Sequence, residues 1–195
     1  MVGGLVEVGL VAAEEEEAFP AAVGMGAVFP AAEAIVEAVA PAAGGEEWRQ
    51  SMKTRHFLNA VDRDKILSAI ATAEKRTTGE IFVFVSHKNV ADALAEATRC
   101  FKKFKMDRTA LHNDVLIFVA PRSHKFAVVG DVGVHAKCGE GFWNEVVEAM
   151  RPRLQHGDFT DALVHGIERV GSLLADHFPP AAGDRKHPSG GVKED

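Results

Sequence analysis

The sequence has little cysteine, with Cys100 and Cys138 the only two thiols among its 195 residues. Two thiols are too few for a disulfide framework and are normal in a reducing compartment. Basic residues are missing from the beginning, because the first Lys or Arg is Arg49, and a secretory signal peptide needs a basic start. The longest uncharged stretch of the first fifty residues, 18–32, contains two prolines and is too short to span a bilayer. We therefore expect a cytoplasmic protein without a membrane span.

The net charge of −6 belongs to one end of the chain. The first fifty residues carry nine acidic side chains and one basic one, which leaves 19 acids and 21 bases in the remainder. This remainder is nearly neutral, and no predicted helix gathers Lys and Arg on one side. A protein that holds a phosphate backbone needs such a basic surface, so we expect no nucleic-acid partner.

Composition divides the chain into three parts. Residues 1–51 form an acidic leader rich in Ala, Gly, Pro and Glu, which cannot bury enough apolar surface to offset its ordering cost. We expect the leader to be disordered, either as an upstream extension before a natural start at Met52 or as a regulatory tether. Residues 52–180 form one domain, and the polar tail 181–195 is expected to be disordered.

Hydrophobic spacing predicts the elements of the domain. Uninterrupted apolar runs at 81–85 and 115–119 indicate strands that are covered on both faces, and 126–129 indicates a third strand. Helical spacing follows Asp62 and Asp92, both suited to cap a helix, and two more helices are expected from Phe142 and Asp158. The helix from Phe142 should be interrupted near Pro152, because proline lacks the amide donor that a helix interior needs.

The connections between these elements predict the topology. A helix separates the first two strands, which makes them parallel neighbours joined by a right-handed crossover. The link 121–124 is so short that the second and third strands must form an antiparallel hairpin. The element order therefore predicts a single-domain α/β fold, a three-layer α/β/α sandwich with a small mixed sheet.

Chemistry-bearing residues gather at the two rims of this predicted sheet. One rim has Ser86, His87, Arg122, His124 and Lys125, which suggest an anion site as an alternative. The other rim combines carboxylates, a carboxamide and an imidazole from separated segments. Oxygen donors of this kind suit a hard divalent cation, calcium or magnesium. The second rim is therefore the preferred site, with Glu80, Asn113, Asp114 and Asp131 as metal ligands and His135 beside them. In the competing interpretation Asp131 caps a turn, Glu80 is solvated and His135 packs beside a helix.

Spacing argues against three other kinds of site. A cysteine phosphatase loop needs Arg six positions after the nucleophile, but Asn144 stands there relative to Cys138. An aspartyl phosphotransfer site has paired acids at the end of a strand. The acidic pair at 62 and 64 has that spacing but begins a helix, so it indicates a charged first turn. His135 and Cys138 have the spacing of half a zinc site, but no second pair completes it.

Four motifs in order resemble those of the TPM domain family, which includes thylakoid and photosystem-repair proteins. They are Thr-Thr-Gly-Glu-Ile at 77–81, Asn-Asp-Val-Leu-Ile at 113–117, Gly-Asp-Val-Gly-Val-His at 130–135, and the late glycines 157 and 166. The resemblance covers roughly residues 56–178 and implies a phosphatase-like domain, with divalent cations bound in loops at one sheet edge in some members and accessory or assembly roles in others. Asp114 stands where the family usually has glycine, which adds an acid beside the expected site.

Residues and resemblance together lead to two functional hypotheses. The first is a divalent-cation site with weak phosphomonoester hydrolysis, in which Asp131 or His135 orients the attacking water. The second is a non-catalytic interaction or assembly module that uses the same rigid sandwich to dock a protein partner.

Overall fold

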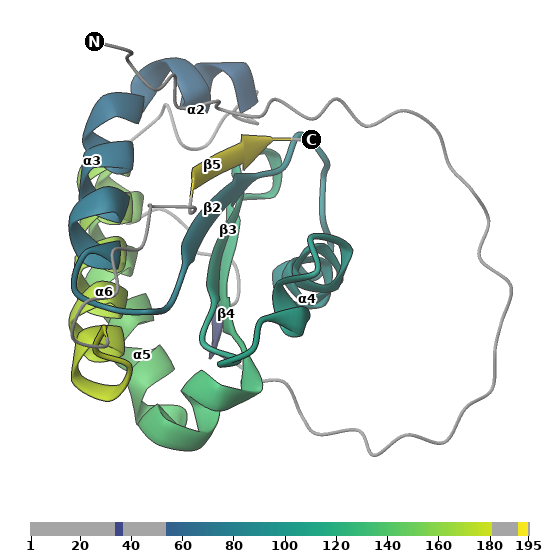
Figure 1. Ribbon diagram of the computed structural model, residues 1–195. Helices are drawn as coiled ribbons and strands as arrows, with labels where there is room; N and C mark the ends of the chain where they lie inside the picture. The colour runs from purple at the N-terminus through teal and green to yellow at the C-terminus, as the bar shows by residue number, and fades with distance from the viewer. Residues whose placement is uncertain (1–33, 37–53, 181–190, 195) are drawn as a thin grey trace, which may run out of the picture.

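The computed structural model describes residues 34–36, 54–180 and 191–194. Its elements, in chain order, are β1 (Ala34–Val36), α2 (Thr54–Ala60), α3 (Arg63–Glu74), β2 (Ile81–Val85), α4 (Ala93–Lys103), the 3₁₀ turn η1 (Met106–Arg108), β3 (Val115–Ala120), the 3₁₀ turn η2 (Pro121–Ser123), β4 (Lys125–Gly130), α5 (Val132–His156), α6 (Phe159–His177) and β5 (Gly191–Glu194). Figure 1 shows three layers, with α3, α5 and α6 on one side of the sheet and α4 on the other. The predicted α/β/α sandwich is confirmed.

The sheet is mixed, with strand order β1-β4-β3-β2-β5. Strands β2 and β3 are parallel, with Ile81 opposite Val115, and β3 and β4 are antiparallel, with Val115 opposite Gly130. The crossover and the hairpin are thus as the connection lengths predict. Because β4 reverses the direction of β3, its end lies at the rim where β2 and β3 begin.

The helices begin where capping chemistry predicts. The Asp62 side chain accepts a hydrogen bond from the Lys65 N–H at 3.1 Å, and Asp92 accepts from Leu94 and Ala95 at the start of α4. Each bond satisfies an amide that has no partner within the first helical turn, and a cap of this type contributes about 1 kcal/mol.

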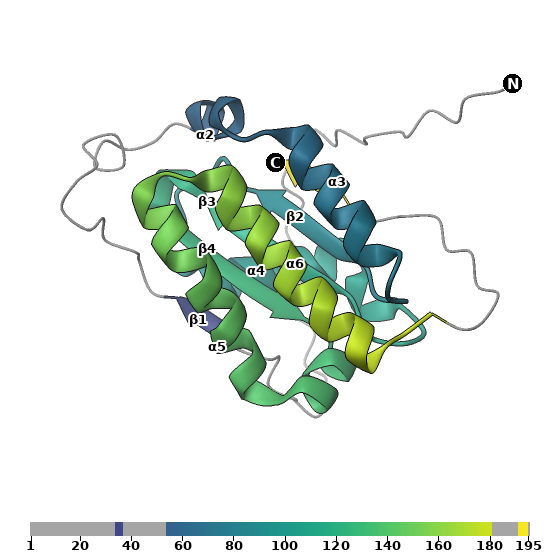
Figure 2. The ribbon, with the colours of Figure 1, turned by 90° about the vertical axis from the view of Figure 1, so that its left-hand side faces the viewer.

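Both faces of the sheet are buried, so each central strand contributes to two cores. Ile81, Val83 and Val115 pack with α3, α5 and α6, which Figure 2 shows lying across that face. Phe82 and Leu116, one residue further along their strands, pack with α4 on the other face. This alternation explains why the central strands are apolar throughout.

The helix after β4 differs from its prediction at both ends. It starts at Val132 rather than Phe142 and runs through Pro152 to His156. Its interruption is a kink at Gly139, whose φ of 70° and ψ of −179° are accessible mainly to glycine. The helix continues across Pro152 because Met150 and Leu154, on either side of it, are buried in the core.

The predicted disorder of both tails is wrong for two short segments. Residues 34–36 of the leader form β1, which pairs antiparallel with β4, and residues 191–194 of the tail form β5, which pairs parallel with β2 (Figure 1). The edges of a three-stranded sheet present unpaired backbone groups, and these segments satisfy them. The rest of the leader and tail, including the expected start at Met52, lies outside the described residues.

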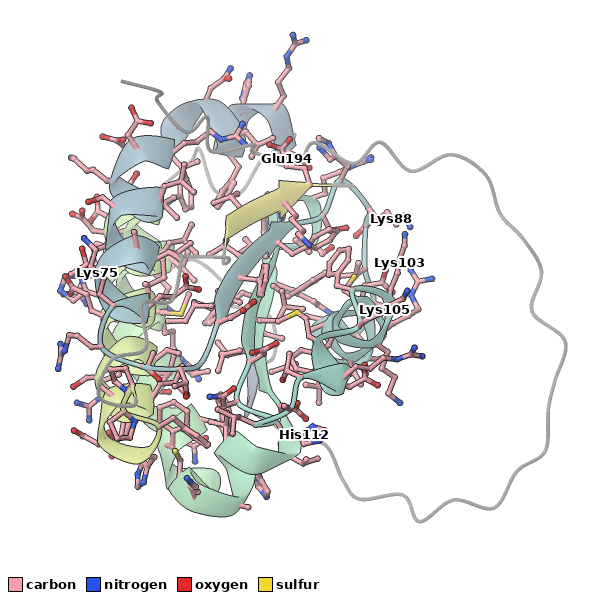
Figure 3. The ribbon with its side chains drawn as sticks, in the orientation of Figure 1. Lys75, Lys88, Lys103, Lys105, His112 and Glu194 are labelled. Atoms are coloured by element: carbon pink, nitrogen blue, oxygen red, sulfur yellow. The ribbon has the colours of Figure 1, made fainter. Side chains whose placement is uncertain are left out.

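One helix has more basic character than the sequence pattern indicates. Lys102 and Lys103 in the last turn of α4, and Lys105 and Arg108 after it, are all exposed. Figure 3 shows Lys88, Lys103 and Lys105 near α4, on the side of the sheet that α4 covers. The expected lack of a nucleic-acid partner stays a prediction. No helix within the described ranges is long and apolar enough to cross a membrane.

Candidate functional site

Backbone hydrogen bonds join the segments that carry the acids of the preferred rim. The Val115 N–H donates to the Glu80 carbonyl at 2.9 Å, and the Asp131 N–H donates to the Asp114 carbonyl at 2.9 Å. The β2–β3 and β3–β4 ladders therefore continue by one residue beyond the strands. We call Glu80, Asn113, Asp114 and Asp131 the acidic rim.

Strand alternation places three of these side chains on one face. Ile81, Val115 and Gly130 are in register and belong to the face of α3, α5 and α6, so the preceding or following residue on each strand belongs to the α4 face. Those residues are Glu80, Asp114 and Asp131. Directly opposed residues on neighbouring strands have Cβ atoms about 5 Å apart, so Glu80, Asp114 and Asp131 follow one another as a row of residues along the rim.

The row is poorly accessible to water. Asp114 is 2 % exposed and Asp131 is 4 % exposed, while Glu80 is half-buried. Buried carboxylates are costly unless hydrogen-bond donors, cations or metals compensate them. Any chemistry at this rim therefore depends on what neutralises the row.

Asp131 has two direct partners. Its Oδ1 accepts a hydrogen bond from the Val132 N–H at 2.7 Å, which makes it the N-cap of α5, and its Oδ2 lies 3.0 Å from His112 Nδ1. The capping role proposed in the competing interpretation is thus present. The His112 side chain is 47 % exposed and lies beside the start of α5, as Figure 3 shows. A buried carboxylate therefore holds one ring nitrogen of an imidazole that reaches solvent.

The structure does not bring His135 to the carboxylate of Asp131. His135 lies in the first turn of α5, in the layer on the other face of the sheet, and only its backbone N–H donates to the Asp131 carbonyl, at 3.2 Å. Its Nδ1 is buried with no hydrogen-bond partner in the described part of the chain. The imidazole at this rim comes instead from His112, which sequence reasoning missed because a lone histidine before a strand gives no periodic signal.

The Thr-Thr-Gly-Glu segment before β2 positions the loop before β3. The Asn113 side-chain amide donates to Thr78 Oγ1 at 2.9 Å, and the Gly79 N–H donates to Thr77 Oγ1 at 3.1 Å. A Cβ at Gly79 would lie 2.6 Å from the Asn113 carbonyl oxygen, so only glycine permits this approach. Asn113 therefore joins the two segments that carry Glu80 and Asp114.

The donor set matches a hard cation better than a soft one. It consists of carboxylate oxygens, and the nearby imidazole nitrogen Nδ1 is already engaged with Asp131. Across residues 34–36, 54–180 and 191–194, no three His, Cys, Asp or Glu side chains converge closely enough to hold a metal ion. A cation here would take its remaining ligands from backbone carbonyls and water, as Mg²⁺ commonly does.

The opposite rim, where β2 and β3 end, is tied together by local contacts. Arg122 donates to the His87 carbonyl at 3.2 Å, and the Lys125 ammonium donates to the Ala91 carbonyl. An acid also lies here, because Glu194 is 3.7 Å from His87. These contacts give the polar residues of this rim structural roles.

Burial also argues against a reactive thiol. It raises the pKa of Cys138, and the smaller opposing influence of Lys137 does not reverse that direction. A nucleophilic cysteine needs a lowered pKa. This agrees with the spacing that disfavours a cysteine phosphatase loop.

Known proteins share this architecture. The family model of the TPM domain matches residues 51–173. The NMR structure of the BA42 protein from the psychrophilic bacterium Bizionia argentinensis is similar, with a TM-score of 0.61 and 34 % identity over 68 % of this chain and 94 % of that chain. No curated protein matches this sequence. The match over most of the sandwich, together with the shared fold, shows that the chain belongs to the TPM domain family.

Proposed function

We propose that this TPM domain binds a divalent cation, Ca²⁺ or Mg²⁺, at the acidic rim, and that the site supports weak hydrolysis of phosphomonoesters. One observation carries the proposal: Glu80, Asp114 and Asp131 flank the paired residues Ile81, Val115 and Gly130, and backbone hydrogen bonds continue the pairing to them. Asp114 and Asp131 would hold the cation, Glu80 would add charge from the half-buried position, and Asn113 would fix the loop.

Electrostatics favour a cation at this place. Two carboxylates on directly opposed residues repel each other, and little water reaches them to screen that repulsion. His112 contacts Asp131 with a single imidazole, at 3.0 Å. A divalent ion would remove the repulsion and offset the cost of burying the carboxylates.

The residues at the rim also suit the activation of water. A bound divalent cation supplies a Lewis acid for a phosphoryl oxygen. With Nδ1 held by Asp131, the other ring nitrogen of His112 is the one available to accept a proton from an attacking water. We assign to His112 the role that was expected for His135.

A second candidate, a docking module without catalysis, has its own supporting observation. Leu111 and Val132 are 55 % and 51 % exposed, and they flank His112 and Asp131 in the sequence. Exposed apolar side chains beside a polar centre are typical of interaction surfaces. The protein partner and the cellular compartment stay predictions.

A hydrolysis assay separates the two candidates. Turnover of a generic phosphate ester is measured with calcium, with magnesium and with a chelator, for the wild type, Asp131→Ala and Asp161→Ala. Asp161 is an exposed acid in the first turn of α6 and serves as the control. The proposal predicts cation-dependent turnover that Asp131→Ala reduces by about 10²-fold or more and Asp161→Ala leaves unchanged. Turnover equal in both variants would rule out the rim as the catalytic site.

A further inference from the structure

The edge strand β5 is recognised by its backbone and by its side chains. Residues 191–194 pair in parallel with residues 82–85 of β2, from Phe82 opposite Gly191 to Val85 opposite Glu194. This pairing satisfies edge groups of β2 that would otherwise be open. The segment adds only four residues to the sheet.

Alternate side chains of β5 contact different parts of the domain. Val192 is 7 % exposed and belongs to the core beneath α3, α5 and α6. On the other face, the Lys193 ammonium lies 5.0 Å from the ring centroid of Phe82 and 4.6 Å from that of Phe104. The edge therefore accepts an apolar side chain followed by a cation.

The last residue of the strand is held by two further groups. Glu194 lies 3.2 Å from the Arg63 guanidinium and 3.7 Å from the His87 imidazole. In Figure 3, Glu194 lies at the end of β5, where α3 begins. Residues 192, 193 and 194 are apolar, basic and acidic in turn. The domain receives them with its apolar core, with two aromatic rings, and with an Arg and a His side chain.

The segment that fills this edge lies outside the TPM match. That match ends at residue 173, whereas β2 and all the side chains that receive β5 lie within it. The receiving edge is therefore part of the domain, and its occupant comes from beyond it.

We propose that the β2 edge is a strand-addition site for an extended segment of a partner protein with the order apolar, Lys or Arg, Asp or Glu, and that residues 191–194 are an intramolecular ligand that occupies it. Main-chain pairing supplies affinity in such sites, and pockets for alternate side chains supply specificity. The site is independent of the acidic rim, because Glu194 pairs at the opposite end of β2.

Tethering sets how strongly a partner must bind. Ten residues, 181–190, join the end of the domain to β5. A short connection of this kind gives an effective concentration on the order of millimolar, so a free peptide of equal intrinsic affinity competes poorly. A partner displaces the tail when its segment binds more tightly or when the tail is weakened.

The test uses full-length, isotope-labelled protein and a synthetic peptide with the sequence of residues 188–195. Amide NMR signals of residues 82–85 are followed as peptide is added to the wild type, to Val192→Asp and to Glu194→Arg. Val192→Asp places a charge in the core position, whereas Glu194→Arg reverses only the contacts with Arg63 and His87. Glu194→Arg keeps the test valid if Val192→Asp fails to fold.

The proposal predicts that Glu194→Arg binds the peptide at least about tenfold more tightly than the wild type, because its own tail competes less. A peptide that carries Val192→Asp should leave the same signals unshifted. Equal binding by the wild type and Glu194→Arg, or equal binding of both peptides, would overturn the proposal. So would a wild-type dimer in which β5 of one copy pairs with β2 of another.

Discussion

The imidazole that contacts Asp131 comes from His112, in the loop before β3, and not from His135 four residues along the chain. Sequence proximity favoured His135. The alternation of side chains along β4 separates Asp131 from His135. It directs the Asp131 side chain to the α4 face, whereas α5, which carries His135, covers the opposite face. The acids could be predicted because their places at strand ends follow from the hairpin. His112 could not, because a loop residue has no periodicity that fixes its direction.

His124 makes the stability of the fold depend on pH. Burial lowers the pKa of His124, so the native state binds this proton more weakly than the unfolded chain does. Stability from this residue is present above the ordinary histidine pKa of about 6.5 and is lost as the pH falls below it. We expect His124→Asn to lose less stability than the wild type under acidification, because the Asn side chain does not take up a proton. Asn is the chosen replacement because it tolerates the φ of 53° at this position. Urea unfolding across pH values of about 7 to 5 measures this, and parallel curves would contradict it.

At the scale of elements, continuous apolar runs predicted the central strands correctly because both faces of the sheet are covered. The helix starts at Asp62 and Asp92 were predictable for a local reason, since each cap contacts its own first turn. The edge strands were not, because strands of three and four residues have too little pattern to distinguish them from coil. They form only because β4 and β2 offer edges to pair with.

The start of α5 was predicted wrongly because the kink at Gly139 interrupts its helical pattern, and two substitutions test whether that kink requires glycine. Gly139→Ala should destabilise the domain by about 1–3 kcal/mol, because the kink conformation is strained for a residue with a Cβ. Gly141→Ala, two residues further along, should be neutral or stabilise by up to about 1 kcal/mol, since a Cβ there would meet no atom within 4 Å and its φ is not positive. Chemical denaturation gives both values. Equal effects of the two substitutions would show that the kink is not a glycine requirement.

At the scale of the whole molecule, the two proposed sites lie on different parts of the sheet. Segments from the starts of β2 and β3 and the end of β4 form the acidic rim, and they meet there only because the hairpin reverses β4. The lateral edges are closed by β1 and β5, both outside the TPM match. The sandwich thus carries the proposed cation site at one rim and the proposed strand-addition site along one edge.

The most direct test of the cation site is an amide NMR titration of the full chain with calcium and, separately, with magnesium. We predict saturable shifts at residues 80, 112–115 and 130–133, with affinity lowered at least about tenfold in Asp114→Asn and Asp131→Asn and unchanged in Asp161→Asn. Unshifted signals at the rim for both ions, or affinities in the rim variants equal to that of Asp161→Asn, would contradict the account.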